Sequence, residues 1–358
     1  MHPAVPAEIV ARAPGKLILF GEHAVNRGQP ALSVSAGLYA TCRLRPDAGP
    51  GIVFESDAPG RARAPTTREA VLDLGRAVDA FRAAGDDDSI RALLRADFFA
   101  PQKYILATAL GAALPRNLTV AFRSEVPGTG GLGSGGAVFA ALATALAALA
   151  GGAPDRARVA DWAHRGDVVA HGGVASRLDT QTSLTGGAVR FAVAAGLAEP
   201  VAVHPGLRLV IGDTGVRAAT AEVNGRVRRW LAERPAARMR YFECVGALSR
   251  TALAPLAAGD WPALGQLMTL NQMVLEKIGV SSPELERLIE AALGAGASGA
   301  KLAGSGGGGI MIALPGPEPG AGAAVAAAIA AAGGRPLTPA LAVPGAALVA
   351  ADPEGGVP

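Results

Sequence analysis

Apolar and polar residues alternate along several stretches of this 358-residue chain. A period of two places every second side chain on one face of a sheet, so each stretch predicts a strand. The predicted strands are residues 7–20, 31–45, 117–126, 188–193, 207–211 and 310–314. No repeat of fixed period relates them.

Other segments place apolar residues every three or four positions, which predicts amphipathic helices. These helices are residues 68–84, 89–95, 156–169, 219–233, 239–258, 261–278 and 283–292, and alanine-rich runs at 137–150 and 320–334 are interpreted as two more. The run at 137–150 is shorter than the roughly 20 residues of a membrane span, so we expect a buried helix.

The chain changes character near residues 195–206, which predicts an N-terminal domain at 1–200 and a C-terminal domain at 201–358. Residues 46–101 are rich in Pro, Asp and Arg and show no recognisable chemistry. They are expected to form variable surface structure.

Composition narrows the class of protein. Half of the residues are hydrophobic and 18% are charged, which is typical of a globular chain. The net charge is only +3, and neither a basic stripe nor aromatic stacking platforms are visible, so a nucleic-acid partner is not expected. Cys42 and Cys244 lie far apart without metal-ligand spacing, and residues 1–9 do not resemble a signal peptide. A cytoplasmic protein with reduced thiols is expected.

The first segment with candidate chemistry is APGKLILFGEHAV, residues 13–25. Lys16 follows a Pro-Gly turn, and a Glu22-His23 pair ends the apolar run. An ammonium group near a reacting hydroxyl stabilises the negative charge that develops there. Lys16 could instead be an ordinary surface charge, but the chain has four lysines against 29 arginines, which favours a need for a compact point charge.

The second segment is PGTGGLGSGGA, residues 127–137, between a predicted strand and the alanine-rich helix. Closely spaced glycines let backbone amides face a ligand, and the N-terminus of the following helix attracts an anion. The segment therefore predicts a phosphate cradle.

The same glycine spacing satisfies the dinucleotide fingerprint G-x-G-x-x-G, and so does the spacing in residues 304–309. A dehydrogenase would also need a second strand that ends in an acidic residue about 20 residues later. The nearest acid, Asp155, has no predicted strand before it. No Gly-Lys-Ser/Thr follows either cluster, so neither is a P-loop.

The third segment, KLAGSGGGG at residues 301–309, is predicted to connect a helix to a strand. Four consecutive glycines cost backbone entropy, so close approach to a ligand explains them better than a flexible connector does. Between the second and third segments lie Asp167 and Asp179. Near a phosphate cradle, one carboxylate could bind Mg²⁺ and the other could orient or deprotonate an acceptor hydroxyl. Either could equally be a helix cap or a turn former.

In this order, the three segments resemble the signature motifs of the GHMP kinases, and NQMVLEKIGVSSPELERL and GAKLAGSGGGG lean toward the mevalonate kinase branch. The resemblance implies a two-domain α+β fold, with an N-terminal domain like ribosomal protein S5 domain 2 and a ferredoxin-like C-terminal domain. It also implies phosphorylation of mevalonate by ATP with Mg²⁺. Phosphomevalonate kinase, another GHMP kinase and a non-catalytic nucleotide-binding regulator are the alternatives.

The resemblance also implies roles for residues. Asp179 matches the catalytic aspartate and Lys16 the lysine near the acceptor hydroxyl. ATP would contact Pro127, Gly130, Gly131, Leu132, Gly133, Ser134 and Gly135. Mg²⁺ would be held by Ser134 and Asp167. The small hydroxy-acid substrate would meet Lys16, Glu22, His23, Asp179, Gly304 and Ser305.

Three departures from the family pattern flank the metal and the acceptor. A pair of serines is reduced to Ser134-Gly135, and Asp167 replaces a longer Glu. One extra residue precedes Ser176, and Arg177 stands where Gly is usual.

The protein is not expected to bind a membrane. The sequence leaves open whether the protein forms a homodimer.

Overall fold

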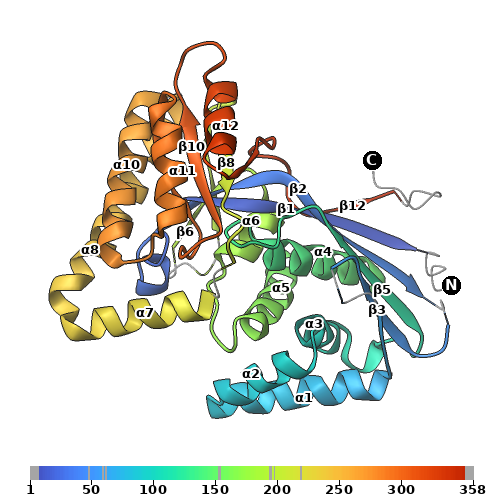
Figure 1. Ribbon diagram of the computed structural model, residues 1–358. Helices are drawn as coiled ribbons and strands as arrows, with labels where there is room; N and C mark the ends of the chain where they lie inside the picture. Colours follow the sequence, from blue (N-terminus) through green and yellow to red (C-terminus); the bar gives the residue numbers. More distant parts are fainter. Residues whose placement is uncertain are drawn as a thin grey trace.

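The computed structural model describes residues 8–350 except 47–48, 59, 61–62, 152–154, 193–195, 197 and 218–219. Two sheets organise this part of the chain (Figure 1). The larger has eight strands in the order β12-β1-β2-β5-β3-β4, with β6 and then β7 joined to β2. Its strands are β1 (Ile9–Phe20), β2 (Ala31–Pro46), β3 (Ile52–Ser56), β4 (Arg63–Thr66), β5 (Leu118–Ser124), β6 (Ala188–Phe191), β7 (Ala198–Val201) and β12 (Ala347–Val349).

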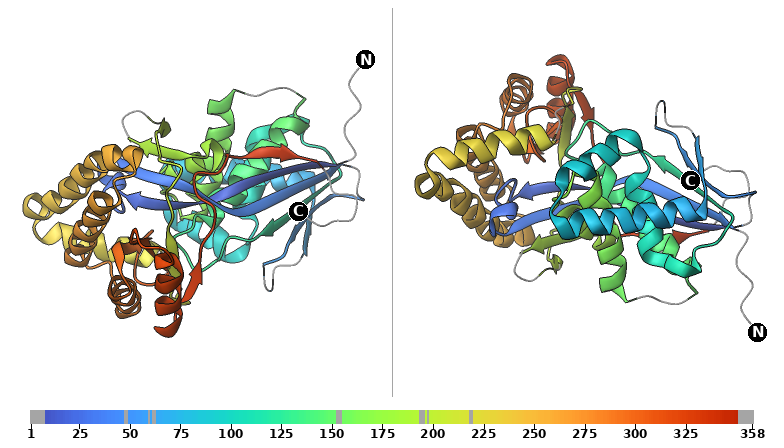
Figure 2. Two further views of the ribbon diagram at one scale, coloured as in Figure 1. Left: turned by 90° about the horizontal axis from the view of Figure 1, so that it is seen from above. Right: turned by 90° about the horizontal axis from the view of Figure 1, so that it is seen from below.

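The larger sheet is built on the long antiparallel pair β1–β2, which runs through the middle of the molecule in both views of Figure 2. Six helices accompany it: α1 (Arg68–Ala84), α2 (Asp87–Ala96), α3 (Ala100–Leu110), α4 (Ser134–Leu149), α5 (Arg156–Ala170) and α6 (Leu178–Thr185). The alanine-rich α4 packs directly on β1 and β2 and is covered in turn by α5. Its small side chains explain how it is buried between a sheet and other helices.

The smaller sheet has four antiparallel strands in the order β11-β8-β10-β9. They are β8 (Val210–Asp213), β9 (Ala297–Ala303), β10 (Ile310–Pro315) and β11 (Arg335–Leu337). The helices of this part are α7 (Thr220–Glu233), α8 (Pro235–Thr251), α9 (Leu253–Ala258), α10 (Trp261–Ile278), α11 (Pro283–Gly294) and α12 (Ala321–Ala331). One hydrophobic cluster contains Leu17 of β1, Met268 of α10 and Ile312 of β10, so the two sheets share a core.

Most predicted elements are confirmed, and α1 and α10 have the predicted bounds. The predicted helix at 239–258 is divided into α8 and α9. The predicted strand at 207–211 is shifted to Val210–Asp213. Where the structure describes them, every predicted strand and helix has a counterpart.

Two predictions were wrong. Residues 301–309 do not connect a helix to a strand, because residues 297–303 form β9 and the glycines link two strands. Residues 46–101 are more than variable surface, because β3 pairs in parallel with β5 and its Ile52 and Phe54 are fully buried in the core. The two predicted domains at 1–200 and 201–358 stay a prediction, and β12 pairs with β1 across that division.

No helix among the described residues is both long enough and apolar enough to cross a bilayer. A cytoplasmic location stays a prediction from the sequence.

Candidate active site

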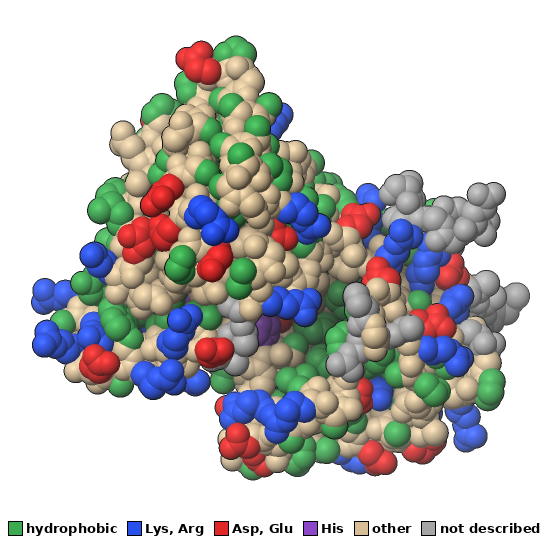
Figure 3. All heavy atoms as spheres, viewed as in Figure 1, with side chains coloured by type: hydrophobic (Ala, Val, Ile, Leu, Met, Phe, Trp, Pro, Cys, Tyr) green, Lys and Arg blue, Asp and Glu red, His purple; other side chains and the backbone are tan. Residues whose placement is uncertain are grey.

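A cavity of about 250 Å³ lies where all the candidate segments meet. The surface is hollowed between the part that carries α7 and the part that carries α1 and α2 (Figure 3). The lining includes Lys16, Glu22, His23, Pro127, Gly130, Gly131, Gly133, Ser134, Gly135, Asp167, His171, Asp179, Thr220, Gly304 and Ser305. Of the predicted site residues, Leu132 alone is outside this lining, and it is fully buried.

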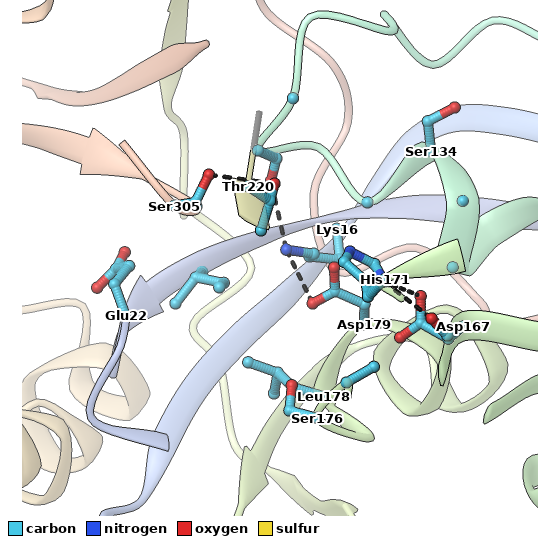
Figure 4. Close-up of a pocket in the computed structure, with 18 of the residues that line it drawn as sticks. Lys16, Glu22, Ser134, Asp167, His171, Ser176, Leu178, Asp179, Thr220 and Ser305 are labelled. Atoms are coloured by element: carbon cyan, nitrogen blue, oxygen red, sulfur yellow. Dashed lines mark hydrogen bonds and ion pairs between the residues drawn. The ribbon is translucent and has the colours of Figure 1, made fainter. Parts of the chain in front are cut away.

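Lys16 and Asp179 form an ion pair in this cavity (Figure 4), with Lys16 Nζ 3.0 Å from Asp179 Oδ1. Lys16 comes from β1, and its own backbone amide donates to Leu132 O of the second glycine segment. Asp179 is the second residue of α6, a helix that no pattern in the sequence indicated. The Lys16 side chain is 3% exposed and that of Asp179 is 28% exposed, so the carboxylate faces the open side.

The second glycine segment has the backbone geometry expected of a phosphate cradle, and phosphate binding there stays a prediction. Gly130, Gly131 and Gly133 adopt positive φ, which glycine tolerates without strain. Gly133 is the N-cap of α4 and offers no side chain to the first amides of the helix. Residues 134–136 line the cavity, so these uncapped amides and the positive end of the helix dipole are available to an anion.

The third glycine segment packs against the second, backbone on backbone. A Cβ on Gly304 would lie 2.6 Å from Gly131 Cα, and a Cβ on Gly131 would lie 2.7 Å from Ala303 O. All five glycines between 304 and 309 have positive φ. The close neighbour of Gly304 is therefore the second glycine segment, and the predicted close approach to a ligand stays a prediction.

Glu22 is almost completely buried, and its carboxylate is already engaged. Lys301 Nζ donates to Glu22 Oε1, and Asn271 Nδ2 donates to Glu22 Oε2 at 3.2 Å. Burial lowers the pKa of Lys301, and the neighbouring Glu22 charge opposes this shift. A direct contact of Glu22 with substrate stays a prediction, while its partner Lys301 was missed. The available signal was one of only four lysines in the chain, placed between apolar residues in the stretch that forms β9.

His23 connects the first segment to the third. Its Nε2–H donates to Ser305 O at 2.9 Å, and its backbone has the unusual φ of 60°. Burial lowers its pKa to about 4, the hydrogen bond to Ser305 opposes the shift, and the charge of Arg27 adds to it. The imidazole is thus neutral at pH 7 and acts as a hydrogen-bond donor.

Asp167 lies on α5 beside His171, with 3.2 Å between Asp167 Oδ1 and His171 Nδ1. The same ring nitrogen donates to Asp167 O at 2.9 Å, and Oδ1 accepts no hydrogen bond from the described residues. Burial disfavours the charged form of His171, but the Asp167 carboxylate outweighs burial and raises the pKa of His171 to about 9.

A divalent cation fits this corner of the cavity. A buried carboxylate oxygen without a hydrogen bond is a suitable hard-oxygen ligand, and Mg²⁺ needs few protein ligands because it keeps several waters. Among the described residues there is no group of three or more His, Cys, Asp or Glu side chains able to cage a metal. Ser134 projects from the start of α4 away from the Lys16–Asp179 pair (Figure 4).

A second, larger cavity of about 960 Å³ continues beyond the second glycine segment. The two cavities share Pro127, Gly130, Ser134 and Gly135. The walls of the larger cavity include the apolar side chains of Phe98, Phe99, Phe122, Val138 and Phe139. A group with a flat apolar base attached to phosphates would suit this arrangement.

Two family models match the chain. "GHMP kinases N terminal domain" matches residues 102–187, and "GHMP kinases C terminal" matches residues 252–335. The chain is 30% identical over 298 residues to the mevalonate kinase of Aeropyrum pernix, covering 82% of this chain and 85% of that relative. It is 31% identical over 303 residues to the mevalonate kinase of Pyrococcus horikoshii, covering 83% and 85%.

Solved structures are also similar. Mevalonate kinase of L. major in complex with R-mevalonate has a TM-score of 0.74 and 25% identity, covering 96% of this chain and 99% of that one. Galactokinase of Lactococcus lactis complexed with galactose has a TM-score of 0.73 and 18% identity, covering 96% and 95%. The second likeness shows the fold alone. Together the comparisons confirm the predicted two-domain α+β fold.

The buried Lys301–Glu22 pair gives a testable expectation about stability. Lys301→Met should lower the free energy of unfolding by about 3–5 kcal/mol, because it leaves the Glu22 carboxylate buried without its cation. The double variant Glu22→Gln/Lys301→Met removes both charges and should regain much of that loss. Urea unfolding measures both. A double variant as unstable as Lys301→Met would show that the pairing of charges is not the cause.

Proposed function

The chain belongs to the GHMP kinase family, and we propose that it transfers the γ-phosphate of ATP to a hydroxyl group of mevalonate. The observation that carries the proposal is the Lys16–Asp179 pair, which opens into one cavity with the amides of the phosphate cradle. Relatives named mevalonate kinase, about 30% identical over most of the chain, support the choice of acceptor.

The two cavities suggest separate binding places for ATP and for the acceptor. The triphosphate would lie along the second glycine segment and the first turn of α4, with the adenosine in the larger cavity beyond it. The acceptor would occupy the smaller cavity, so that its hydroxyl meets Asp179 and Lys16. Holding both reactants in line is most of what a phosphoryl-transfer site must do.

In the reaction, the hydroxyl oxygen forms a bond to the γ-phosphorus as the bond to the β–γ bridging oxygen breaks, and ADP leaves. Asp179 accepts a hydrogen bond from the hydroxyl, orients it, and takes its proton. The Lys16 ammonium lies 3.0 Å from the same carboxylate and stabilises negative charge on the transferring group. Asp167 and Ser134 would hold Mg²⁺, which would supply positive charge to offset that of the ATP phosphates.

The charged groups that line the cavity affect which acceptor can bind there. Among the described residues that line it, Lys16 is the only lysine or arginine, and Asp179 already pairs with it. The charged groups His171 and Asp167 at the wall face each other, and the Glu22 carboxylate is paired with Lys301. Thr220, Asn224 and Ser305 add neutral donors and acceptors. An acceptor with a single carboxylate suits this wall better than a phosphorylated acceptor, whose extra charge would need a cation.

An acceptor screen tests the assignment directly. ADP release should be fastest with mevalonate when it is compared with phosphomevalonate, galactose and homoserine at equal concentration. Preference for any of the other three would overturn the acceptor. ATP binding without ADP release on any acceptor would favour a nucleotide-binding regulator.

Asp179→Asn and Lys16→Ala should each lower kcat by roughly 10²–10⁴-fold, because positioned acid–base groups contribute about that much. The KM for ATP and the melting temperature should change little. Lys103→Ala is a matched control, since Lys103 forms an ion pair with Asp97 at 2.7 Å outside the cavity lining. Retention of more than about a tenth of kcat by Asp179→Asn would disprove its role.

If Mg²⁺ binds at Asp167 and Ser134, two substitutions should shift the Mg²⁺ concentration for half-maximal rate in opposite directions. Asp167→Ala should raise the Mg²⁺ concentration for half-maximal rate, because it removes the buried carboxylate expected to bind the metal. Gly135→Ser should lower it by adding a hydroxyl; a Cβ there would lie 3.5 Å from Phe139, an ordinary contact. Asp155→Ala, at the N-cap of the same helix α5, is the control. An unchanged titration in Asp167→Ala would mean that the ligand lies elsewhere.

A further inference from the structure

Behind the catalytic helix α6, a row of charged side chains connects its start to α5, α3 and α1. It begins at Arg177, the N-cap residue of α6, which does not line the cavity. Arg177 Nη2 donates to Asp161 Oδ1 of α5 at 3.3 Å, and Arg165 Nε donates to Asp161 Oδ2 at 2.7 Å. Asp161 therefore joins the start of α6 to the middle of α5.

The row continues through Tyr104, a fully buried residue of α3. Arg165 Nη1 donates to Tyr104 OH at 3.2 Å, and Arg82 Nη1 of α1 donates to it at 3.0 Å. Tyr104 OH in turn donates to Asp79 Oδ1 of α1 at 2.6 Å. The helices that surround α5 thus fix the position of Arg165, which fixes Asp161.

The backbone of Arg177 is held to the first turn of α6, which carries Asp179. Its carbonyl oxygen accepts the first hydrogen bonds of α6, from Gln181 N at 3.0 Å and from Thr180 Oγ1 at 3.3 Å. On the other side, Gly136 of α4 touches the Asp179 backbone, since a Cβ on Gly136 would lie 3.1 Å from it. A displacement of residue 177 would therefore move Asp179 relative to Lys16 and to the phosphate cradle.

We propose that Arg177 is a positioning residue, whose ion pair with Asp161 holds the N-terminus of α6 so that Asp179 faces Lys16. The same pairing keeps the Arg177 guanidinium away from Asp179, two residues along the chain, where it would compete with Lys16. The proposal rests on the proposed function, because it assigns a role relative to Asp179.

A positioning role and a stabilising role predict different effects of losing the Arg177–Asp161 pair. The Arg177 side chain is 32% exposed and that of Asp161 is 38% exposed, so the pair itself is expected to contribute little to stability. Catalysis is far more sensitive, because a displacement of about 1 Å can cost as much as about 10²-fold in rate. Burial opposes ionisation of Asp161, but hydrogen bonds from Arg165 and Arg177 lower its pKa, so both partners are charged at pH 7.

The test uses Arg177→Met, Asp161→Asn and the double variant in the full chain. Each single variant should lower kcat by about 10-fold or more, with the KM for ATP within about twofold of wild type and little change in melting temperature. The double variant should lose no more than the worse single variant, because each single variant already lacks the Arg177–Asp161 ion pair. Arg177→Lys, which restores a cation, should recover part of kcat.

Arg190→Met is the matched control, because Arg190 pairs with Glu199 at 2.6 Å between β6 and β7, outside the cavity lining. Its kcat should equal that of wild type. Unchanged kcat in Arg177→Met, or losses in the two single variants that multiply in the double variant, would overturn the proposal. So would a fall in kcat fully accounted for by a lower melting temperature.

Hydrogen exchange measured by mass spectrometry gives a result that needs no turnover. Peptides that contain residues 178–185 should exchange faster in Arg177→Met and Asp161→Asn than in wild type or Arg190→Met. Unchanged protection of α6 in both variants would overturn the proposed role of the Arg177–Asp161 ion pair, which we call the tether, even if the enzyme is active. The kinetic ratios are measured on whichever acceptor the wild type uses, so failure of mevalonate as substrate and failure of the tether are separate results.

Discussion

The contact between the two glycine loops is the constraint on which the active site depends. Gly131 and Gly304 lie in loops that follow strands of different sheets, β5 and β9, and no side chain separates them. A Cβ on either would collide with the backbone of the other segment. This contact brings the end of β9 against the phosphate cradle. It also brings Ser305 to His23, whose Nε2–H donates to its carbonyl. The wall of the cavity at this point therefore consists of backbone, and a single added methyl group would push the two loops apart.

Two lysine–carboxylate pairs flank this contact, and their burial gives them different roles. The side chains of Glu22 and Lys301 are completely buried, so this pair joins the turn after β1 to β9 without contact with solvent. Lys16 is equally buried, but Asp179 is partly exposed to the cavity, so a ligand can reach that carboxylate. Chemistry is possible at the second pair because only one partner is fully desolvated.

The sequence indicated the three glycine segments and most elements, because turn glycines and apolar periodicity are local signals. The pairing of Lys16 with Asp179 in one site followed only from the family resemblance, and the chemistry of that pair stays a prediction. It did not predict α6, whose residues 178–185 are mostly polar but buried, with Thr182 bonded to Ser33 of β2. Nor did it indicate that Lys301 pairs with Glu22 across 279 residues of chain, since no local pattern encodes a partner so distant. The ion pair between Arg177 and Asp161 was not predicted either, because it joins two helices and one of them, α6, was not predicted.

The central claim is that the phosphate cradle and the Lys16–Asp179 pair act on one hydroxyl group between them. A crystal structure of the Asp179→Asn variant with ATP, Mg²⁺ and mevalonate tests this most directly. We expect the acceptor hydroxyl oxygen about 3 Å from the side chain of residue 179, with the γ-phosphate on its far side and close to Lys16 Nζ. A triphosphate that lies away from residues 130–136, or an acceptor whose hydroxyl points away from residue 179, would contradict the account.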